Sequence, residues 1–300
     1  MRVFVTGASG FVGSAVVSEL IAAGHQVLGL ARSDESAAAV SAAGAEVQRG
    51  SLDDSESLRS GAAGADAVIH TAFIHDWSNF ERSCATDERA IETLGGVLAG
   101  SNRPLLVTSG VAMLRPGQLS TEEMVAPFHP EFPRASERAA GALGARGVRS
   151  GIVRLPPSVH GAGDHGFVPI LIGIAREKGV SAYVGEGANR WPAVHRSDAA
   201  RVYRLAIGKS IPMAHLHAVA EEGVPFREIA EAIGRGLNLP VVSKSRDEAA
   251  EHFGWFARFA AIDCPSSSAK TREALGWAPE QPGLIADVTA QYFNEPAVRN

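Results

Sequence analysis

The stretch VFVTGASGFVG, residues 3–13, decides the fold, because it joins a buried strand to a helix through three glycines. Arg2 to Val5 form a β-branched and aromatic run that stops at a turn signal, which is typical of a buried parallel strand. From Ser14 to Ala23 the apolar residues recur at helical spacing. A strand, a tight turn and a helix in this order predict a nucleotide phosphate site.

The three glycines have different tasks in such a turn. Gly7 allows the sharp change of direction, Gly10 lets the main chain approach a pyrophosphate, and Gly13 lets the helix pack close to the strand. Unpaired N–H groups at the helix N-terminus then face the anion. The other cofactor contacts expected in this turn are Ser9, Phe11 and Val12.

The residues that follow distinguish this site from an ordinary tight turn. Gly24 ends the helix as a C′ residue, and Gln26 to Ala31 form a second apolar strand. Strand, helix and strand fit within about thirty residues, the size of one βαβ unit. We therefore favour a dinucleotide site over a turn without function.

The spacing Gly7-x-x-Gly10-x-x-Gly13, preceded by Thr6, resembles the nucleotide-binding signature of the short-chain dehydrogenase/reductase superfamily, in its extended and atypical, epimerase/dehydratase-like branches. The resemblance implies an α/β fold, a Rossmann-type doubly wound parallel sheet with a smaller C-terminal α/β substrate lobe. We expect a dinucleotide-binding domain at 1–155, with a later contribution near 194–220, and the substrate lobe at 156–300. The resemblance continues through SLDD at 51–54, VIHTAF at 68–73, LVTSG at 106–110, RLPP at 154–157, HGAG at 160–163 and AVHRSDAA at 193–200.

The same resemblance implies further site residues. Ser109, at the end of the fifth strand, matches the active-site Ser of the family, and Asp53 matches the Asp that touches the adenine. A homodimer through helices near 79–99 and 132–146 is also expected by analogy. The remaining implied cofactor contacts are Leu52, Thr71, Ala72, Phe73 and Pro156.

The residues after the second strand indicate which dinucleotide is bound. An acidic residue there bonds the ribose 2′-OH of NAD, whereas an Arg accommodates the 2′-phosphate of NADP. Arg32 places a guanidinium where it can fork onto a phosphate, and Ser33 adds a hydroxyl donor. Asp34 follows, and it complicates this choice unless it serves as the N-cap of the next helix. We favour NADP, with NAD as the alternative.

The catalytic pair of the family is missing from this chain. Reductases of the family use a Tyr four residues before a Lys, and none of the three tyrosines here has a Lys at that distance. The family register places Pro133 at the Tyr position and Glu137 at the Lys position, while a shift by one residue gives Phe132 and Ser136. Only Ser109 remains of the catalytic set.

A proton donor other than Tyr would compensate for the missing Tyr and Lys. His75, beside Asp76 after the fourth strand, is a candidate proton donor because imidazole titrates near neutral pH, and a surface loop is the alternative. Glu137 is either a general base or part of a charged helix face. Loss of the pair is equally compatible with NADP binding without reduction, and with a reaction in which the cofactor is structural.

Two segments have the composition of substrate-facing loops. Residues 160–167, HGAGDHGF, form either a mobile substrate loop or a plain crossover. Residues 183–192, YVGEGANRWP, form either a substrate loop or a tight hairpin whose Trp191 fills the interface between the lobes. No metal site is expected, since His215-x-His217 has no recognisable third ligand.

The composition fits a soluble cytoplasmic enzyme. The chain has 300 residues and a formal net charge of −5 with dispersed positive charge, so a nucleic-acid partner is not expected. Cys84 and Cys264 lie far apart in the sequence, which indicates a reducing compartment. No apolar run reaches the roughly 18 residues that a membrane span needs.

Beyond Pro156 the pattern predicts mainly helices, one of them from Asp247 to Phe259. We interpret the chain as an NADP-dependent oxidoreductase acting on a small carbonyl or hydroxyl compound. One alternative is a non-catalytic, NADP-binding sensor or regulatory protein. Another is a relative of the sugar-nucleotide epimerases and dehydratases.

Overall fold

The structure is a computed structural model that describes residues 1–112, 114–127, 133–209 and 215–293. Its centre is a seven-stranded sheet in the order β10-β6-β5-β4-β1-β2-β3, in which every neighbouring pair is parallel. This order reverses direction beside β1, so the predicted doubly wound sheet is confirmed. The strands are β1 (Arg2–Thr6), β2 (Gln26–Ala31), β3 (Glu46–Arg49), β4 (Ala67–His70), β5 (Leu105–Gly110), β6 (Ser150–Leu155) and β10 (His215–His217).

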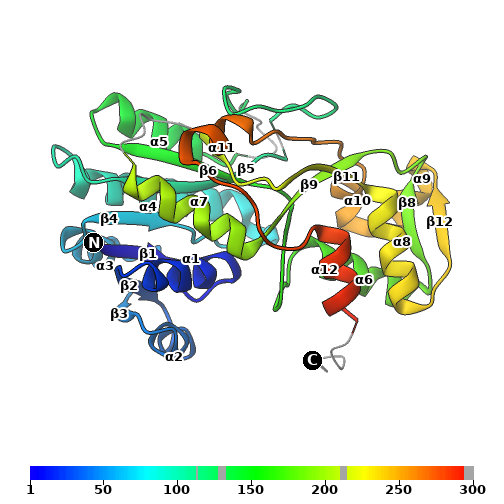
Figure 1. The fold of residues 1–300 in the computed structure, drawn as a ribbon, viewed down its shortest axis with the longest axis horizontal. Helices are drawn as coiled ribbons and strands as arrows, with labels where there is room; N and C mark the ends of the chain where they lie inside the picture. The colour runs from blue at the N-terminus through cyan, green and yellow to red at the C-terminus, as the bar shows by residue number, and fades with distance from the viewer. Residues whose placement is uncertain (113, 128–132, 210–214, 294–300) are drawn as a thin grey trace.

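Helices cover both faces of this sheet (Figure 1). On one face, buried residues of α1, α2 and α7 share an apolar core with the strands, and α1 packs directly on α7. On the other face, α3, α4 and α5 share a second core with Phe4 and neighbouring strand residues. The helices are α1 (Phe11–Ala22), α2 (Asp34–Ala42), α3 (Ser55–Ala63), α4 (Phe80–Leu98), α5 (Ser136–Ala145) and α7 (Arg196–Gly208), with a short 3-10 turn η1 (Trp77–Asn79) before α4.

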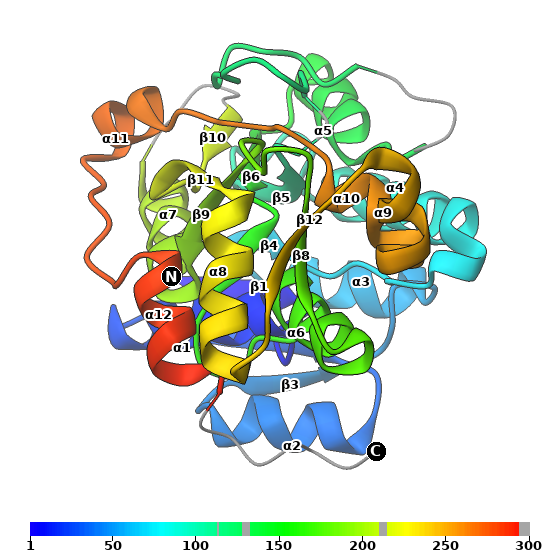
Figure 2. The same cartoon turned by 90° about the vertical axis from the view of Figure 1, so that its right-hand side faces the viewer.

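A second group of elements lies beside the sheet and faces the viewer in Figure 2. It contains a three-stranded sheet in the order β11-β9-β7 and a parallel pair of β8 and β12, with helices around its own apolar core. Its strands are β7 (Ser158–His160), β8 (Ser181–Val184), β9 (Arg190–His195), β11 (Glu221–Pro225) and β12 (Val241–Lys244). Its helices are α6 (Phe167–Lys178), α8 (Phe226–Leu237), α9 (Arg246–Phe253), η2 (Gly254–Phe256), α10 (Ala257–Ala260) and α12 (Leu284–Gln291), while α11 (Ala269–Leu275) lies against α7 and β10.

Two predicted helices differ from the structure. The helix expected from Asp247 to Phe259 is interrupted at Gly254, whose φ of 55° is left-handed and ends α9. The helix expected near 132–146 begins only at Ser136. Phe132 lies outside the described residues.

Trp191 fills the core of the second group and does not face a ligand. Its side chain is fully buried, and its ring lies 4.9 Å from the ring of Phe226, 5.8 Å from Phe167 and 6.1 Å from Phe256. Among the described residues that line the large cavity, none comes from residues 183–192. The expectation of a substrate loop there is therefore wrong, because an aromatic-rich sequence suits a lobe core equally well.

We expect Trp191→Ala to lower the free energy of unfolding by about 3–5 kcal/mol, since a large void would open in the aromatic core. Urea unfolding followed by fluorescence measures this loss. Trp255→Ala is the matched control, because Trp255 is 58% exposed. An equal loss in both variants would contradict the assignment of Trp191 to the core.

Candidate functional site

A cavity of 1320 Å³ lies at the C-terminal ends of the strands, between the large sheet and the second group. Its wall takes residues that follow β1, β2, β3, β4, β5 and β6, and on the other side residues of α6 and α10. Ligands of open α/β sheets bind at this edge. The volume exceeds the roughly 300–1,000 Å³ of a site for one drug-sized molecule, so it has room for a dinucleotide and a second ligand.

The glycine turn after β1 has the predicted geometry. Gly7 has a left-handed φ of 72°, and the N–H of Gly10 donates to the Gly7 carbonyl at 2.9 Å. At Gly13, a Cβ would lie 2.0 Å from the Gly7 carbonyl oxygen and 2.8 Å from the Thr71 hydroxyl. Strand end and helix therefore approach so closely that only glycine fits, as the sequence predicts for Gly13.

The predicted cofactor residues come together around this cavity, with one exception. Ser33 does not line it, because its hydroxyl accepts from the N–H of Ser36 and caps α2. Asp34, the N-cap expected from sequence, is instead the first helical residue. The residues that do line the cavity are Gly7, Ser9, Gly10, Phe11, Val12, Gly13, Arg32, Leu52, Asp53, Thr71, Ala72, Phe73 and Pro156.

The two charged residues after β2, Arg32 and Asp34, differ in whether they reach the cavity. Asp34 pairs with Arg49, and its carboxylate does not line the cavity. Arg32 does line it and is exposed, and within the described residues no hydrogen bond or ion pair engages its guanidinium. A free cation therefore lies where the sequence predicts the 2′-phosphate.

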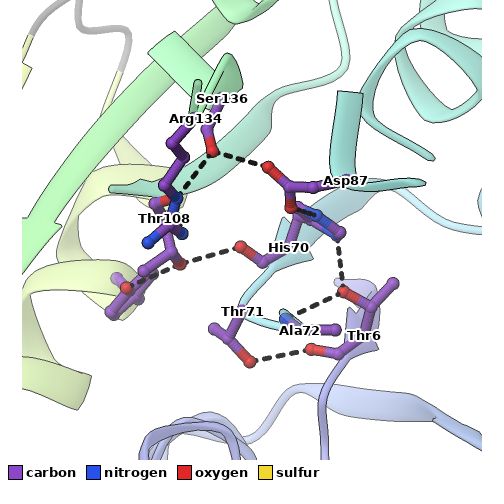
Figure 3. Close-up of polar contacts among 9 residues, drawn as sticks. Thr6, His70, Thr71, Ala72, Asp87, Thr108, Arg134 and Ser136 are labelled. Carbon is purple, nitrogen blue, oxygen red and sulfur yellow. Dashed lines mark hydrogen bonds and ion pairs between the residues drawn. The ribbon is translucent and has the colours of Figure 1, made fainter. Parts of the chain in front are cut away.

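A buried chain of hydrogen bonds runs inward from Ser136, a residue of the cavity wall, to residues that do not line the cavity (Figure 3). His70, at the end of β4, bonds Thr6 of β1 at 2.7 Å and Asp87 of α4 at 3.0 Å. The other oxygen of Asp87 accepts from Ser136 at 2.5 Å, and Ser136 accepts from Nε of Arg134 at 3.0 Å. The chain fixes the start of α5 relative to β1 and β4, so it sets the shape of the cavity wall.

This network keeps Asp87 ionised although it is buried. Burial acts to raise the pKa of Asp87, but the hydrogen bonds and charges of His70, Arg134 and Ser136 outweigh it and lower the pKa. The ionised Asp87 accepts from Nε2 of His70, and Nδ1 of His70 lies 2.7 Å from the Thr6 hydroxyl. No pattern in the sequence indicated this pairing of His70 with Asp87.

All three candidate catalytic residues, Ser109, Glu137 and His75, line the cavity. Glu137 is not part of an exposed charged face, because its side chain is 11% exposed and forms a two-pronged pair with Arg154 at 2.7 and 2.8 Å. Burial raises its pKa, yet the Arg154 pair outweighs this, helped by the Ser109 hydroxyl and His215, and the net pKa is lowered. Glu137 is therefore an acceptor and not a proton donor at neutral pH.

His75 lies at the exposed rim of the cavity. Its ring contacts Phe73 in an edge-to-face arrangement at 5.2 Å, and its pKa is lowered by burial first, then by the charges of Arg134 and His165. The imidazole is therefore neutral at neutral pH. The adjacent Asp76 caps the short turn η1 by accepting from Ser78.

The tyrosines are absent from the described wall of the cavity. Burial raises the pKa of Tyr203, whose hydroxyl bonds Thr108 at 2.9 Å, and Tyr292 donates to Asp164 at 2.6 Å. Tyr183 lies under the guanidinium of Arg227 in the second group. No lysine lines the described wall either, so the structure offers no displaced copy of the family's pair.

His215 and His217 have different surroundings. His215 lines the cavity 3.8 Å from Glu137, whereas both ring nitrogens of the buried His217 are engaged, one by Arg154 and one by the Ser267 carbonyl. Within the described ranges, no three His, Cys, Asp or Glu side chains gather as metal ligands would. In the same ranges, no helix has the length and apolar character needed to cross a bilayer.

Part of one segment that the sequence predicted to face the substrate lies at the site, together with three residues that the sequence did not single out. Of the loop at 160–167, Asp164 to Phe167 line the cavity, and the ring of His165 packs against Phe11 at 5.7 Å. Arg134, Ser36 and Phe259 line it as well. Of these last three residues, only Arg134 could have been found from the sequence, because it lies between Pro133 and Glu137, the register positions of the missing Tyr and Lys.

Sheet order, glycine turn and edge cavity together define a doubly wound α/β protein with a nucleotide-type cleft. The chain belongs to the NAD dependent epimerase/dehydratase family, whose model matches residues 3–215. This confirms the resemblance found in the sequence.

Similar proteins extend over nearly the whole chain. An uncharacterized protein of Schizosaccharomyces pombe is 50% identical over 294 residues, 98% of this chain and 100% of its own length. The 2-alkyl-3-oxoalkanoate reductase of Stenotrophomonas maltophilia is 28% identical over 261 residues, 82% of this chain and 78% of its own. The structure of Thermus thermophilus UDP-glucose 4-epimerase in complex with NAD matches with a TM-score of 0.74 at 20% identity, covering 96% of this chain and 97% of that one, which supports the fold.

Proposed function

We propose that the protein is an NADP-dependent oxidoreductase that interconverts a small carbonyl compound and its alcohol. One observation carries the proposal: a single cavity brings together the glycine turn, the unpaired Arg32 and Ser109 at the end of β5. The reductase named among the relatives supports carbonyl chemistry, and the NAD complex of the epimerase supports a nicotinamide cofactor in this fold. Residues 1–155, with 194–220, would bind the cofactor, and 156–300 would shape the substrate side.

The residues present fit a dinucleotide. Gly13 lets α1 begin directly against the turn after β1, and the N-terminal N–H groups of α1 are available to a pyrophosphate. A bound nicotinamide would supply the hydride. Ser109 gives its one hydroxyl hydrogen to Glu137, which Arg154 holds ionised, so the Ser109 oxygen would accept from the hydroxyl group of the alcohol and orient it. Glu137 does not supply the proton, and His75, whose pKa is lowered as well, would act as the donor only in the imidazolium form that it takes below neutral pH.

We expect Arg32→Ala to weaken NADPH binding roughly tenfold to hundredfold, because charge-assisted hydrogen bonds to the 2′-phosphate would be lost. NADH binding should be unchanged. Fluorescence titration with both nucleotides measures the two dissociation constants. Arg59→Ala is the control, since Arg59 is exposed on α3 and is not among the residues that line the cavity.

An equal weakening of both nucleotides, or tighter binding of NADH by the unchanged protein, would contradict NADP preference. Binding of neither nucleotide would remove the oxidoreductase proposal altogether.

One observation favours a second candidate function, a non-catalytic NADP sensor. Pro133 and Glu137 occupy the register positions of the Tyr and Lys, and neither Tyr nor Lys lines the described wall. Oxidation of NADPH, followed at its near-ultraviolet absorbance with a panel of ketones, aldehydes and oxo acids, separates the two. Turnover supports the enzyme, whereas tight NADPH binding without turnover on the panel supports the sensor.

A further inference from the structure

Arg134 holds its guanidinium in one fixed orientation at the cavity wall (Figure 3). Nε donates to Ser136 at 3.0 Å, and Nη2 donates to the Thr108 carbonyl at 3.2 Å. The guanidinium carbon lies 4.4 Å from the centre of the Phe73 ring, which adds a cation–π contact. A planar cation held on three sides is preorganised for a ligand, because binding would cost little side-chain entropy.

The positive charge of Arg134 has no direct counter-ion in the described part of the chain. No carboxylate there lies within ion-pair distance, and Nη1 makes no hydrogen bond. The nearest acid in the network, Asp87, is already engaged by His70 and Ser136. A half-buried cation without a carboxylate is costly, and an anionic ligand would remove that cost.

By contrast, the neighbouring arginines are neutralised. Arg138, which also lines the cavity, pairs with Glu88 at 2.8 Å, and the buried Arg154 pairs with Glu137. The field of Arg134 nevertheless reaches the cavity, since it contributes to the lowered pKa of His75. Of these three arginines, Arg134 is therefore the one whose charge is available to a ligand in the cavity.

The place of Arg134 in the sheet separates it from the cofactor phosphates. It is anchored on Thr108 of β5, two strands from the glycine turn after β1 and three from Arg32 after β2. With strands about 4.8 Å apart, these offsets are about 10 and 14 Å. The anchoring carbonyl directly precedes Ser109, so an anion on Arg134 would lie beside the group that orients the substrate oxygen.

We propose that Arg134 binds the carboxylate of the substrate, so that the compound interconverted at Ser109 is a short oxo acid and its hydroxy acid. The assignment rests on the proposed function and specifies its substrate class. Nη1 offers two N–H donors to the carboxylate, while Phe73 packs against the guanidinium from one side. Because an ester or amide of the same acid carries no negative charge, it would lose most of its attraction to the Arg134 guanidinium.

The test compares acetoacetate with methyl acetoacetate, and 2-oxobutanoate with its methyl ester, by ligand-observed NMR titration. The protein is saturated with NADP⁺, which cannot reduce a ketone, so binding is measured without turnover. We expect at least one acid to bind about tenfold or more tightly than its ester. Arg134→Gln should abolish this difference and Arg134→Lys should keep part of it, whereas Arg138→Gln, the matched control, should keep it all.

Several results would overturn the assignment. One is equal or tighter binding of both esters by the unchanged protein, and another is an acid preference that survives in Arg134→Gln. Weaker NADP⁺ binding in Arg134→Gln with no change in the acid-to-ester ratio would assign Arg134 to the cofactor. If NADP⁺ does not bind at all, the proposed function fails, and the same titrations without nucleotide still decide whether Arg134 selects the acid. Thermal unfolding of each variant confirms that it is folded.

Discussion

Replacing Gly13 with Ala should weaken NADPH binding by at least about a hundredfold and lower the free energy of unfolding by about 3 kcal/mol. The added Cβ would lie 2.0 Å from the Gly7 carbonyl oxygen and 2.7 Å from its carbonyl carbon. These are backbone atoms of the turn itself, so they cannot rotate away as a side chain would. Relief of the clash must push α1 away from β1 and open the turn that receives the pyrophosphate.

Gly96→Ala provides the matched control for this prediction. Gly96 lies on the exposed face of α4, and a Cβ there would meet no atom within 4 Å. The change should leave binding intact and stabilise the helix by about 0.5–1 kcal/mol, because Ala favours helix over Gly. Fluorescence titration and urea unfolding measure both variants. A Gly13→Ala protein that binds NADPH as well as the unchanged protein would show that the turn does not hold the nucleotide.

The glycine turn was predictable because its constraints are local. Gly7, Gly10 and Gly13 lie within one strand-turn-helix unit, and backbone sterics alone restrict each position. The same is true of β2, whose predicted bounds, Gln26 to Ala31, are those observed. Helix starts were less certain, since Ser33 and Asp34 are both good caps and only the structure shows that Ser33 is used.

The polar core of the site was not predictable, because its contacts join distant elements. His70 and Asp87 lie 17 residues apart on β4 and α4, and Glu137 and Arg154 lie 17 apart on α5 and β6. The hydrophobic periodicity of a single helix or strand does not reveal such pairs. A Glu early in a helix reads as a surface charge near the helix N-terminus, and its burial follows only from the way α5 packs on the sheet.

Removing one partner of the buried ion pair should strongly destabilise the fold. We expect Arg154→Met to lower the free energy of unfolding by about 3–5 kcal/mol at pH 7. Arg154 is fully buried, and its loss would strand the Glu137 carboxylate and remove the donors to His217 and to the Met124 carbonyl. Burial lowers the pKa of His217 to about 4, so this neutral imidazole could not replace the cation.

The loss of unfolding free energy in Arg154→Met should be smaller at acidic pH than at neutral pH. In the unchanged protein the pKa of Glu137 lies below its ordinary value of 4.5, so the pair stabilises the fold above that pH and the contribution is lost as the pH falls. Without Arg154, only the Ser109 hydroxyl and His215 oppose the effect of burial, so the pKa of Glu137 rises and the variant gains relative stability on acidification. Urea unfolding at pH 7 and pH 4 should therefore show a smaller difference at pH 4.

A double variant separates the structural role of this pair from its role at Ser109. Arg154→Met with Glu137→Leu removes both charges and should recover about 2 kcal/mol of the loss, while His217 and the Met124 carbonyl still lack their donor. If the pair served stability alone, carbonyl reduction would return with it. We expect reduction to stay lost while NADPH still binds, because the Ser109 hydroxyl would no longer be held by an ionised carboxylate. A stable and fully active double variant would remove Glu137 from the proposed mechanism and leave Arg154 a purely structural residue.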